Sequence, residues 1–240
     1  MLQNGSLSEA INGDFDFTIK EILKEAWERT EGAKFKFNIS FFIYVFIAVI
    51  LSTLLSHLFN PEVYYKTQQF FKGFLSEQAQ TLLSLPILMP IMSGIIMMAI
   101  KRASYKRIEI LSVFNYYVYV WPLVFASLLM NAIILIGFVL LIIPGIYLSI
   151  TFAFTVPLII DKQLGIIDAL KTSFKAVSKH WWKFFGLYML LFLFSLLSLL
   201  TFGIGFIWVL PLSFMVNGVL YRRIFGFSNI ERIESEEAAL

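Results

Sequence analysis

The chain has 240 residues, of which 59% are hydrophobic and 15% are charged. These polar residues are too few to cover a soluble domain, which excludes an ordinary soluble protein and indicates a membrane protein. The absence of cysteine excludes disulfides and thiolate metal sites, and the net charge of +3 is spread between apolar segments, so nucleic acid is not an expected partner.

The first expected element is an amphipathic helix that follows a short N-terminal segment. We expect residues 1–16 to form a disordered cytoplasmic N-terminus without a cleavable signal peptide, because no basic stretch precedes an apolar run there. In residues 17–30, apolar side chains recur at helical spacing, and Lys and Glu occupy the opposite face. This pattern predicts a helix on the membrane surface, with Trp27 as an anchor at the headgroup level.

Six membrane-spanning helices are predicted from long apolar stretches, because one span needs roughly 20 residues. The predicted spans are residues 37–58, 81–100, 114–136, 138–160, 182–202 and 205–221. The segment from Ile110 to Ile160 contains no charged residue and is too long for one span, so we divide it at a tight turn near Gly137. Residues 17–226 are thus expected to form one integral membrane domain.

Lysine and arginine are distributed unequally between the loops that connect the predicted spans. Of the 19 basic residues, 17 lie in the two termini and in the two loops on the same side. The positive-inside bias therefore predicts that both termini are cytoplasmic, together with the acidic tail at residues 227–240.

The chain is predicted to contain three copies of one structural unit. An amphipathic segment precedes each pair of spans, and each segment contains an acidic residue, an apolar residue and a leucine in succession, at residues 21–23, 109–111 and 168–170. We therefore expect an all-α fold of three transmembrane hairpins, each preceded by a cytoplasmic amphipathic helix, as a three-fold internal repeat.

Prolines recur in the second span of each predicted hairpin. Proline removes one backbone hydrogen bond, and membrane helices tolerate this where neighbouring protein bonds the freed group. We expect kinks near the outer ends of spans two, four and six, at Pro86 and Pro90, at Pro144 with Gly145, and at Pro211. The alternative is that Pro144 begins a helix directly after the turn. Both interpretations give Pro144 a structural role.

A longer motif lies between residues 140 and 186. It combines Pro-Gly-Ile-aromatic-Leu, a second proline, an acid, a glycine, Ala-Leu-x-x-Ser and an aromatic pair. These positions are Pro144, Gly145, Ile146, Tyr147, Leu148, Pro157, Asp161, Gly165, Ala169, Leu170, Ser173, Trp181 and Trp182. The segment resembles the YciC-like bacterial proteins and the membrane domains fused to some glycerophosphodiester phosphodiesterases. The resemblance implies a six-helix protein of the bacterial inner membrane, connected with lipid or envelope biology but with no established activity.

No catalytic or metal-binding arrangement is found in the sequence, so we expect no enzymatic activity, no cofactor and no metal. His180 lies beside Trp181 and Trp182, a combination typical of an anchor at the headgroup level. No ionisable residue lies deep in a predicted span, which argues against a proton-coupled carrier. Asn131 and Asn217 lie within spans and are expected to face the bundle, as interhelical hydrogen-bonding groups or, alternatively, as ligand contacts.

Basic residues near the predicted cytoplasmic surface are candidate contacts for the headgroups of anionic phospholipids. Lys171, Lys175 and Lys179 repeat every four residues on one face of an amphipathic helix, and Lys183 and Arg102 lie near the ends of spans. The alternative is that this helix packs on the bundle and that its lysines only set the topology.

The expected function is that of a non-enzymatic membrane protein that binds or organises lipid or supports envelope integrity. The lipid bilayer is thus the expected partner. A transporter or channel for a small or hydrophobic solute is one alternative, and an assembly partner of other membrane proteins is another. The pattern of residues does not predict an oligomeric state.

Overall fold

The computed structural model describes residues 5–58 and 69–228, and every regular element in these ranges is a helix. The elements are α1 (Leu7–Asn12), α2 (Ile19–Thr30), α3 (Lys34–Leu58), α4 (Gln69–Ala103), the 3₁₀ helix η2 (Leu111–Tyr119), α5 (Val120–Leu140), α6 (Ile142–Thr151), α7 (Thr155–Asp161), α8 (Ile166–Lys179), α9 (Trp181–Leu200) and α10 (Phe206–Phe225). The prediction of an all-helical fold is confirmed for these ranges.

Five stretches of helix in the described ranges are long and apolar enough to cross a membrane, as expected of a membrane protein. They are Lys34–His57, Gln78–Ala103, Leu111–Leu140, Ile142–Asp161 and Trp181–Leu200. The sixth predicted span corresponds to α10, which is not among the five, since Arg222 and Arg223 in its last turn lower its mean hydropathy.

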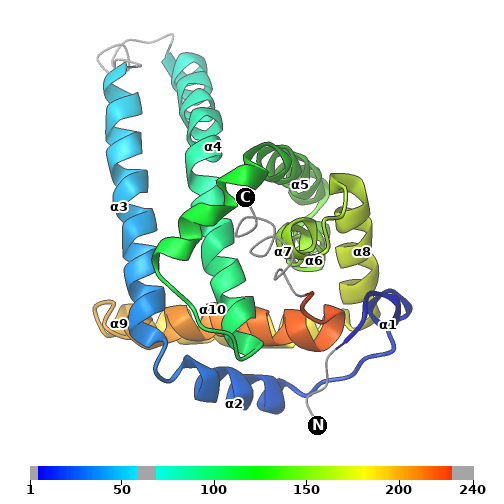
Figure 1. The fold of residues 1–240 in the computed structure, drawn as a ribbon. Helices are drawn as coiled ribbons and strands as arrows, with labels where there is room; N and C mark the ends of the chain where they lie inside the picture. Colours follow the sequence, from blue (N-terminus) through cyan, green and yellow to red (C-terminus); the bar gives the residue numbers. More distant parts are fainter. Residues whose placement is uncertain (1–4, 59–68, 229–240) are drawn as a thin grey trace, which may run out of the picture.

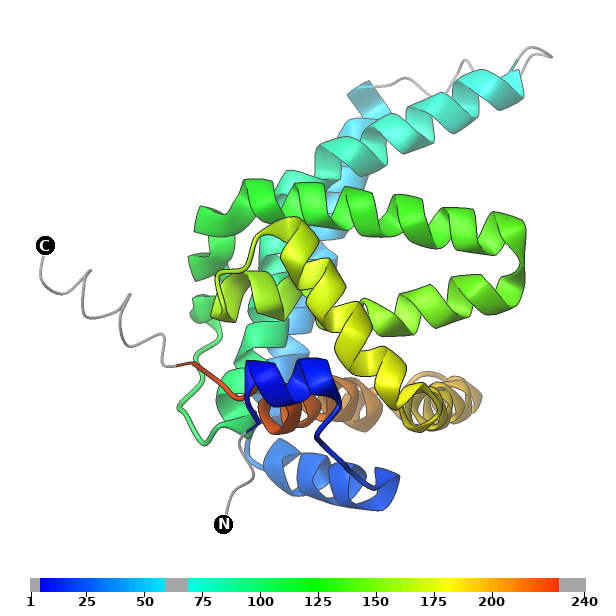
Figure 2. The ribbon, with the colours of Figure 1, turned by 90° about the vertical axis from the view of Figure 1, so that its right-hand side faces the viewer.

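Consecutive long helices lie side by side in three pairs, α3 with α4, α5 with α6, and α9 with α10. In Figure 1, α3 and α4 run upward, whereas α9 and α10 run across the lower part of the molecule. The α5–α6 pair is seen nearly end-on in Figure 1 and points to the right in Figure 2. The three pairs point in different directions, so no single membrane normal is parallel to all of them.

Each predicted amphipathic segment packs on a helix of a different pair. Helix α2 packs on α10, η2 packs on α4, and α8 packs on α6 and α7. Each is held by small or branched apolar side chains that are fully buried, such as Ile22 in α2, Val113 in η2 and Val177 in α8. The hydrophobic core therefore lies where these segments meet α4, α7 and α10.

The N-terminal segment is ordered from Gly5 onward, so the prediction of disorder over residues 1–16 is wrong for the part that the structure describes. Ser6 and Glu9 form a reciprocal capping box at the start of α1. Ala10 is fully buried, and α1 packs on α8 and α10. Residues 1–4 and residues 229–240 of the predicted acidic tail lie outside the described ranges.

The predicted kink at Pro144 is wrong, and the alternative interpretation is nearer to the structure. Helix α5 continues through Gly137 to Leu140, and Leu141 is extended before α6 begins at Ile142. Pro144 is thus the third residue of α6, where its missing N–H breaks no helical bond. Gly145 is a packing residue rather than a kink, because a Cβ there would meet the Phe138 ring of α5.

The fourth predicted span is instead interrupted between α6 and α7, where Pro157 lies in the first turn of α7. The hydroxyl of Ser173 in α8 bridges this interruption. It donates a hydrogen bond to the Thr151 carbonyl at 2.7 Å and accepts one from the Phe154 N–H at 3.2 Å. A side chain from a neighbouring helix therefore bonds backbone groups that the interrupted helix leaves free.

The other three prolines of the prediction lie inside helices. Pro86 and Pro90 are within α4, and Pro211 is within α10. Each removes a backbone N–H from the interior of its helix, and the kinks expected there stay predictions.

Candidate functional site

The side chains that could carry chemistry are dispersed in the described part of the chain. Among residues 5–58 and 69–228, no group of three or more His, Cys, Asp or Glu residues is placed to hold a metal ion. His57, at the end of α3, and His180, before α9, belong to different parts of the fold. The features with binding potential are therefore pockets and charged surfaces.

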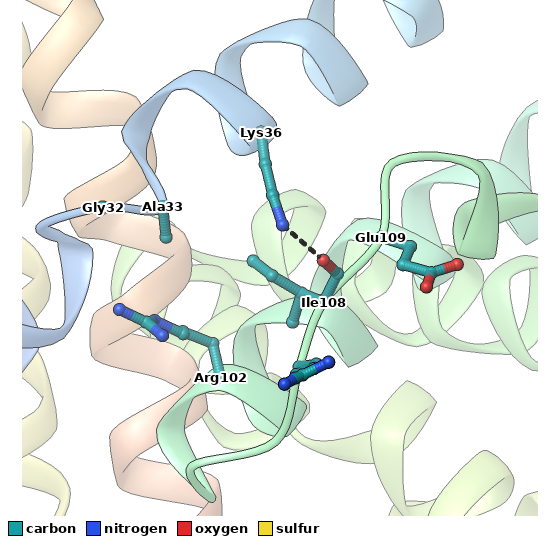
Figure 3. A pocket seen from close by; sticks show the side chains of 7 residues that line it. Gly32, Ala33, Lys36, Arg102, Ile108 and Glu109 are labelled. Carbon is teal, nitrogen blue, oxygen red and sulfur yellow. Dashed lines mark hydrogen bonds between the residues drawn. The ribbon is translucent and has the colours of Figure 1, made fainter.

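A basic pocket of about 310 Å³ lies between the α2–α3 turn and the loop that follows α4 (Figure 3). Its charged lining comes from Lys36, Arg102, Arg107 and Glu109, and Gly32, Ala33 and Ile108 complete it. Lys36 is in the first turn of α3 and Arg102 is in the last turn of α4. Both helices contain candidate spans, and Lys36 and Arg102 lie near the ends of those spans.

The cations of the basic pocket are held by neutral carbonyls rather than by carboxylates. Lys36 Nζ donates to the Ile108 carbonyl at 2.8 Å. Arg102 donates through Nε to the Arg29 carbonyl at 3.1 Å and through Nη2 to the Glu31 carbonyl at 2.9 Å. Figure 3 shows the Glu109 carboxylate pointing away from Lys36 and Arg102. The positive charge of the pocket is thus not neutralised by an ion pair among the described residues.

The three lysines predicted on α8 are all exposed. Two apolar side chains of α8, Ile167 and Phe174, are also exposed beside Lys171 and Lys175. Leu170 and Val177 of the same helix are buried in the protein. The outward face of α8 therefore combines lysines with apolar side chains, the composition of a helix that lies in a membrane surface.

Lys183 and His180 contact the N-terminal segment instead of forming a free surface. Lys183 forms an ion pair with Asp16, and the hydrogen bond from Lys183 holds the pKa of the Asp16 carboxyl below its ordinary value. His180 Nε2 lies 3.2 Å from the Gly13 carbonyl, and its ring packs against Phe15. The prediction of Lys183 as a free headgroup contact is not supported, because its charge already has a partner.

The predicted tryptophan anchors occupy different environments. Trp182 is 78% exposed, whereas Trp181 lies partly buried between Tyr147 and Phe185. Trp27 is exposed, and the Lys34 ammonium lies 5.0 Å from its ring centre. Trp27 and Trp182 therefore present aromatic surface outward, as an anchor would.

The two predicted asparagines also differ. Asn217 accepts a hydrogen bond of 2.7 Å from the Tyr188 hydroxyl and so links α10 to α9. Asn131 lies on the exposed side of α5 and donates to the Ser127 carbonyl of its own helix. Asn217 therefore faces a neighbouring helix, as the prediction expected of both, whereas Asn131 is exposed and bonds within its own helix.

A central cavity of about 220 Å³ lies among α4, the α6–α7 interruption and α10. It is lined by Met92, Ile96, Ile100, Ala153, Phe154, Pro157, Phe214 and Asn217. These helices correspond to predicted spans two, four and six. The cavity is mainly apolar, with Asn217 as the polar side chain in its wall.

Two buried charged groups were missed by the sequence analysis. Glu25 of α2 is surrounded by Arg29, Arg222 and Arg223 at 2.6–2.7 Å. The carboxylate of Asp161 accepts hydrogen bonds from the Tyr221 hydroxyl and the Ser228 N–H. The local signals were the four-residue spacing of Glu25 and Arg29 and the adjacent Lys162, which lies 3.2 Å from Asp161, because the other partners are distant in the sequence.

Comparisons with known proteins identify no relative. No family model, no curated protein and no solved structure matches the chain. The resemblance to the YciC-like proteins therefore stays a prediction.

Proposed function

We propose that this chain is a non-enzymatic protein of the bacterial inner membrane that binds anionic phospholipid at its cytoplasmic face. The basic pocket is the observation that carries this proposal. Three cations from two membrane helices and one loop line it, and the hydrogen-bond partners of Lys36 and Arg102 are uncharged. Arginine and lysine at the end of a membrane helix attract anionic lipid, and arginine can bind a phosphate through two parallel bonds.

The proposed membrane arrangement has six spans in three hairpins, with both termini in the cytoplasm. The order of packing supports a three-fold repeat, because the amphipathic segment before each hairpin packs on the second helix of the preceding hairpin. Thus η2 lies on α4, α8 lies on α6 and α7, and α2 lies on α10, which closes the cycle. In this arrangement the helices tilt away from a common axis, which accounts for the different directions of the three pairs (Figures 1 and 2).

The sharpest test of lipid binding uses Arg107, which is exposed and makes no hydrogen bond or ion pair in the described ranges. Its removal should therefore leave the fold unchanged. We expect Arg107→Gln to lower the retention of phosphatidylglycerol by about fivefold, equivalent to the ~1 kcal/mol that one basic side chain contributes near an anionic surface. Arg107→Glu should lower it further. Native mass spectrometry of the detergent-purified chain measures the retained lipid.

Two controls make this test specific. Lys20→Gln removes an exposed charge from α2, outside the pocket, and should leave lipid retention unchanged. Inorganic phosphate, added as a competitor, distinguishes a lipid site from a site for a free anion. Retention of phosphatidylglycerol by Arg107→Glu at the level of the unchanged protein would overturn the proposal.

Carriage of a small apolar solute is a second candidate, favoured by the central cavity beside an interrupted helix. Interrupted membrane helices line substrate sites in several transporter folds. Ala153 lines the cavity, so Ala153→Phe would fill it. Solute flux into liposomes that Ala153→Phe abolishes would establish transport, and equal flux with empty liposomes would exclude it for that solute.

A further inference from the structure

A groove of about 500 Å³ lies between α2, α9 and α10, and it shares no lining residue with the basic pocket. Its walls are Leu23, Trp27, Phe194, Trp208, Val209 and Leu212, and its lining is almost entirely apolar. Trp27 and Trp208 are 43% and 41% exposed, so the groove is open to the surroundings of the protein. In water, such an exposed apolar surface would favour aggregation, but beside membrane helices the surrounding medium is hydrocarbon.

Two opposite charges stand at the rim of this groove. Lys24 and Glu28 line it from α2, one helical turn apart, and both side chains are exposed. They form no ion pair with each other or with another described residue. Because the lining is apolar, they contribute their carbon stems to the groove and present their charged ends outside it.

The position of the groove indicates a membrane lipid as the occupant. One wall is α9, a candidate span, another is α10, and the third is α2, an amphipathic helix whose Lys24 and Glu28 are exposed. The acyl part of a lipid would lie along Phe194 and Trp208, with its headgroup at Lys24 and Glu28. A peptide would bring backbone N–H and C=O groups into this lining, which offers them no partner.

We propose that this groove binds a zwitterionic phospholipid whose headgroup carries both a phosphate and a primary ammonium, such as phosphatidylethanolamine. Lys24 binds the phosphate and Glu28 binds the ammonium, while the acyl chain fills the apolar groove. The basic pocket, which has an excess of positive charge, selects an anionic lipid instead. The two sites differ in residues and in headgroup, so this inference does not depend on the proposed function.

The test compares two lipids in the full chain. We expect Glu28→Gln to lower retention of phosphatidylethanolamine by about two- to fivefold, the contribution of one exposed ion pair, with little change in phosphatidylglycerol. Lys24→Gln should lower retention of both lipids at this site, and Glu28→Lys should reverse the preference towards phosphatidylglycerol. Native mass spectrometry of the purified chain, after exchange into each lipid in turn, gives the two retentions.

Matched controls separate this site from a general charge effect and from misfolding. Lys20→Gln and Asp14→Asn change exposed charges outside the groove and should change neither retention. Val209→Trp fills the groove and should lower retention of phosphatidylethanolamine without altering the helical circular dichroism. Glu28→Gln and Val209→Trp variants that both retain phosphatidylethanolamine like the unchanged chain would overturn the inference. Unchanged retention of phosphatidylglycerol in Arg107→Gln would contradict only the proposed function.

Discussion

The side-chain amide of Asn38, in the first turns of α3, donates a hydrogen bond of 3.0 Å to the backbone carbonyl of Ile207 in α10. Ile207 lies four residues before Pro211, so its carbonyl is the one that Pro211 leaves without a helical partner. One side chain from a distant part of the chain thus completes the hydrogen bonding of a proline-containing helix.

This relationship predicts a coupling between Asn38 and Pro211. Asn38→Ala leaves the Ile207 carbonyl unbonded, which should lower the free energy of unfolding by about 1–3 kcal/mol. In a Pro211→Ala background, the restored N–H bonds this carbonyl, and Asn38→Ala should then have a much smaller effect. Thermal unfolding in detergent, monitored by circular dichroism, measures the four proteins of the cycle. Additive effects would contradict the coupling. Asn131→Ala is a suitable control, because Asn131 bonds only within its own helix.

The charge cluster around Glu25 predicts a strong mutational effect. The Glu25 and Arg222 side chains are 15% and 4% exposed, and Arg222 also donates to the Ala103 carbonyl. Glu25→Gln would leave Arg222 without its carboxylate, which should cost about 3 kcal/mol of stability. Glu28→Gln, an exposed carboxylate on the same helix, should cost little and is the matched control. Equal melting temperatures for the two variants would exclude a stabilising role for the cluster.

The same cluster predicts a dependence of stability on pH. Burial favours the neutral acid, but hydrogen bonds from Arg223 and Arg29 outweigh it and hold the pKa of Glu25 below its ordinary value of 4.5. The contribution of Glu25 is therefore complete above pH 4.5 and is lost as the pH falls through the lowered pKa, since the unfolded chain binds the proton first. When the pH is lowered from about 6 to about 4, the melting temperature of Glu25→Gln should fall less than that of the unchanged chain.

Close contact between α4 and α10 predicts that Gly218 cannot be enlarged. A Cβ at Gly218 would lie 2.5 Å from the backbone oxygen of Ala99, so one helix would have to move. We expect Gly218→Ala to destabilise the protein by about 1–3 kcal/mol, the usual cost of overpacking. Gly186→Ala meets only the end of the flexible Ile19 side chain, at 3.2 Å, and should be tolerated. If the two variants have equal melting temperatures, α4 and α10 do not pack as described.

The proposed six-span arrangement predicts the side of the membrane on which the α9–α10 turn lies. Because the chain has no cysteine, single cysteines can be introduced and labelled without background. Ile204 is 61% exposed in this turn, and Ile204→Cys should react with a membrane-impermeant maleimide from the outside of intact cells. Asp14→Cys should react only after the membrane is opened. Protection of Ile204→Cys until that point would place α9 and α10 within the cytoplasmic half of the membrane, at the depth where Ile207 accepts the hydrogen bond from Asn38 near the start of α3.

The position of helices was predictable from local sequence, whereas the position of their interruptions was not. Apolar runs long enough to fill a bilayer identified α3 and α9 within a few residues, because hydrophobicity over roughly 20 residues needs no knowledge of neighbours. Helix α4 begins twelve residues before its predicted span, and α5 begins six residues after its predicted start. The turn between α5 and α6 lies at Leu141 rather than near Gly137. The position of the turn depends on the packing of Gly137 against Gly145, and that contact exists only when α5 and α6 lie side by side.

For the candidate binding residues too, the local sequence predicted single residues, whereas the fold determined their partners. Arg102 was predicted from its place at the end of a span, but its partnership with Lys36 and Arg107 in one pocket required α3 and the loop after α4 to meet. Lys183 was predicted as a candidate contact for a lipid headgroup, but the N-terminal segment brings Asp16 to it.

Composition and hydropathy alone therefore determined that this is a helical membrane protein, and the spacing of apolar and charged residues determined its surface helices. Only the tertiary structure decided which polar groups are satisfied and which remain available to a ligand. The physical reason is that hydrophobicity is a property of each segment, whereas hydrogen bonds and ion pairs form between segments that the sequence separates, as between Asn38 and Ile207.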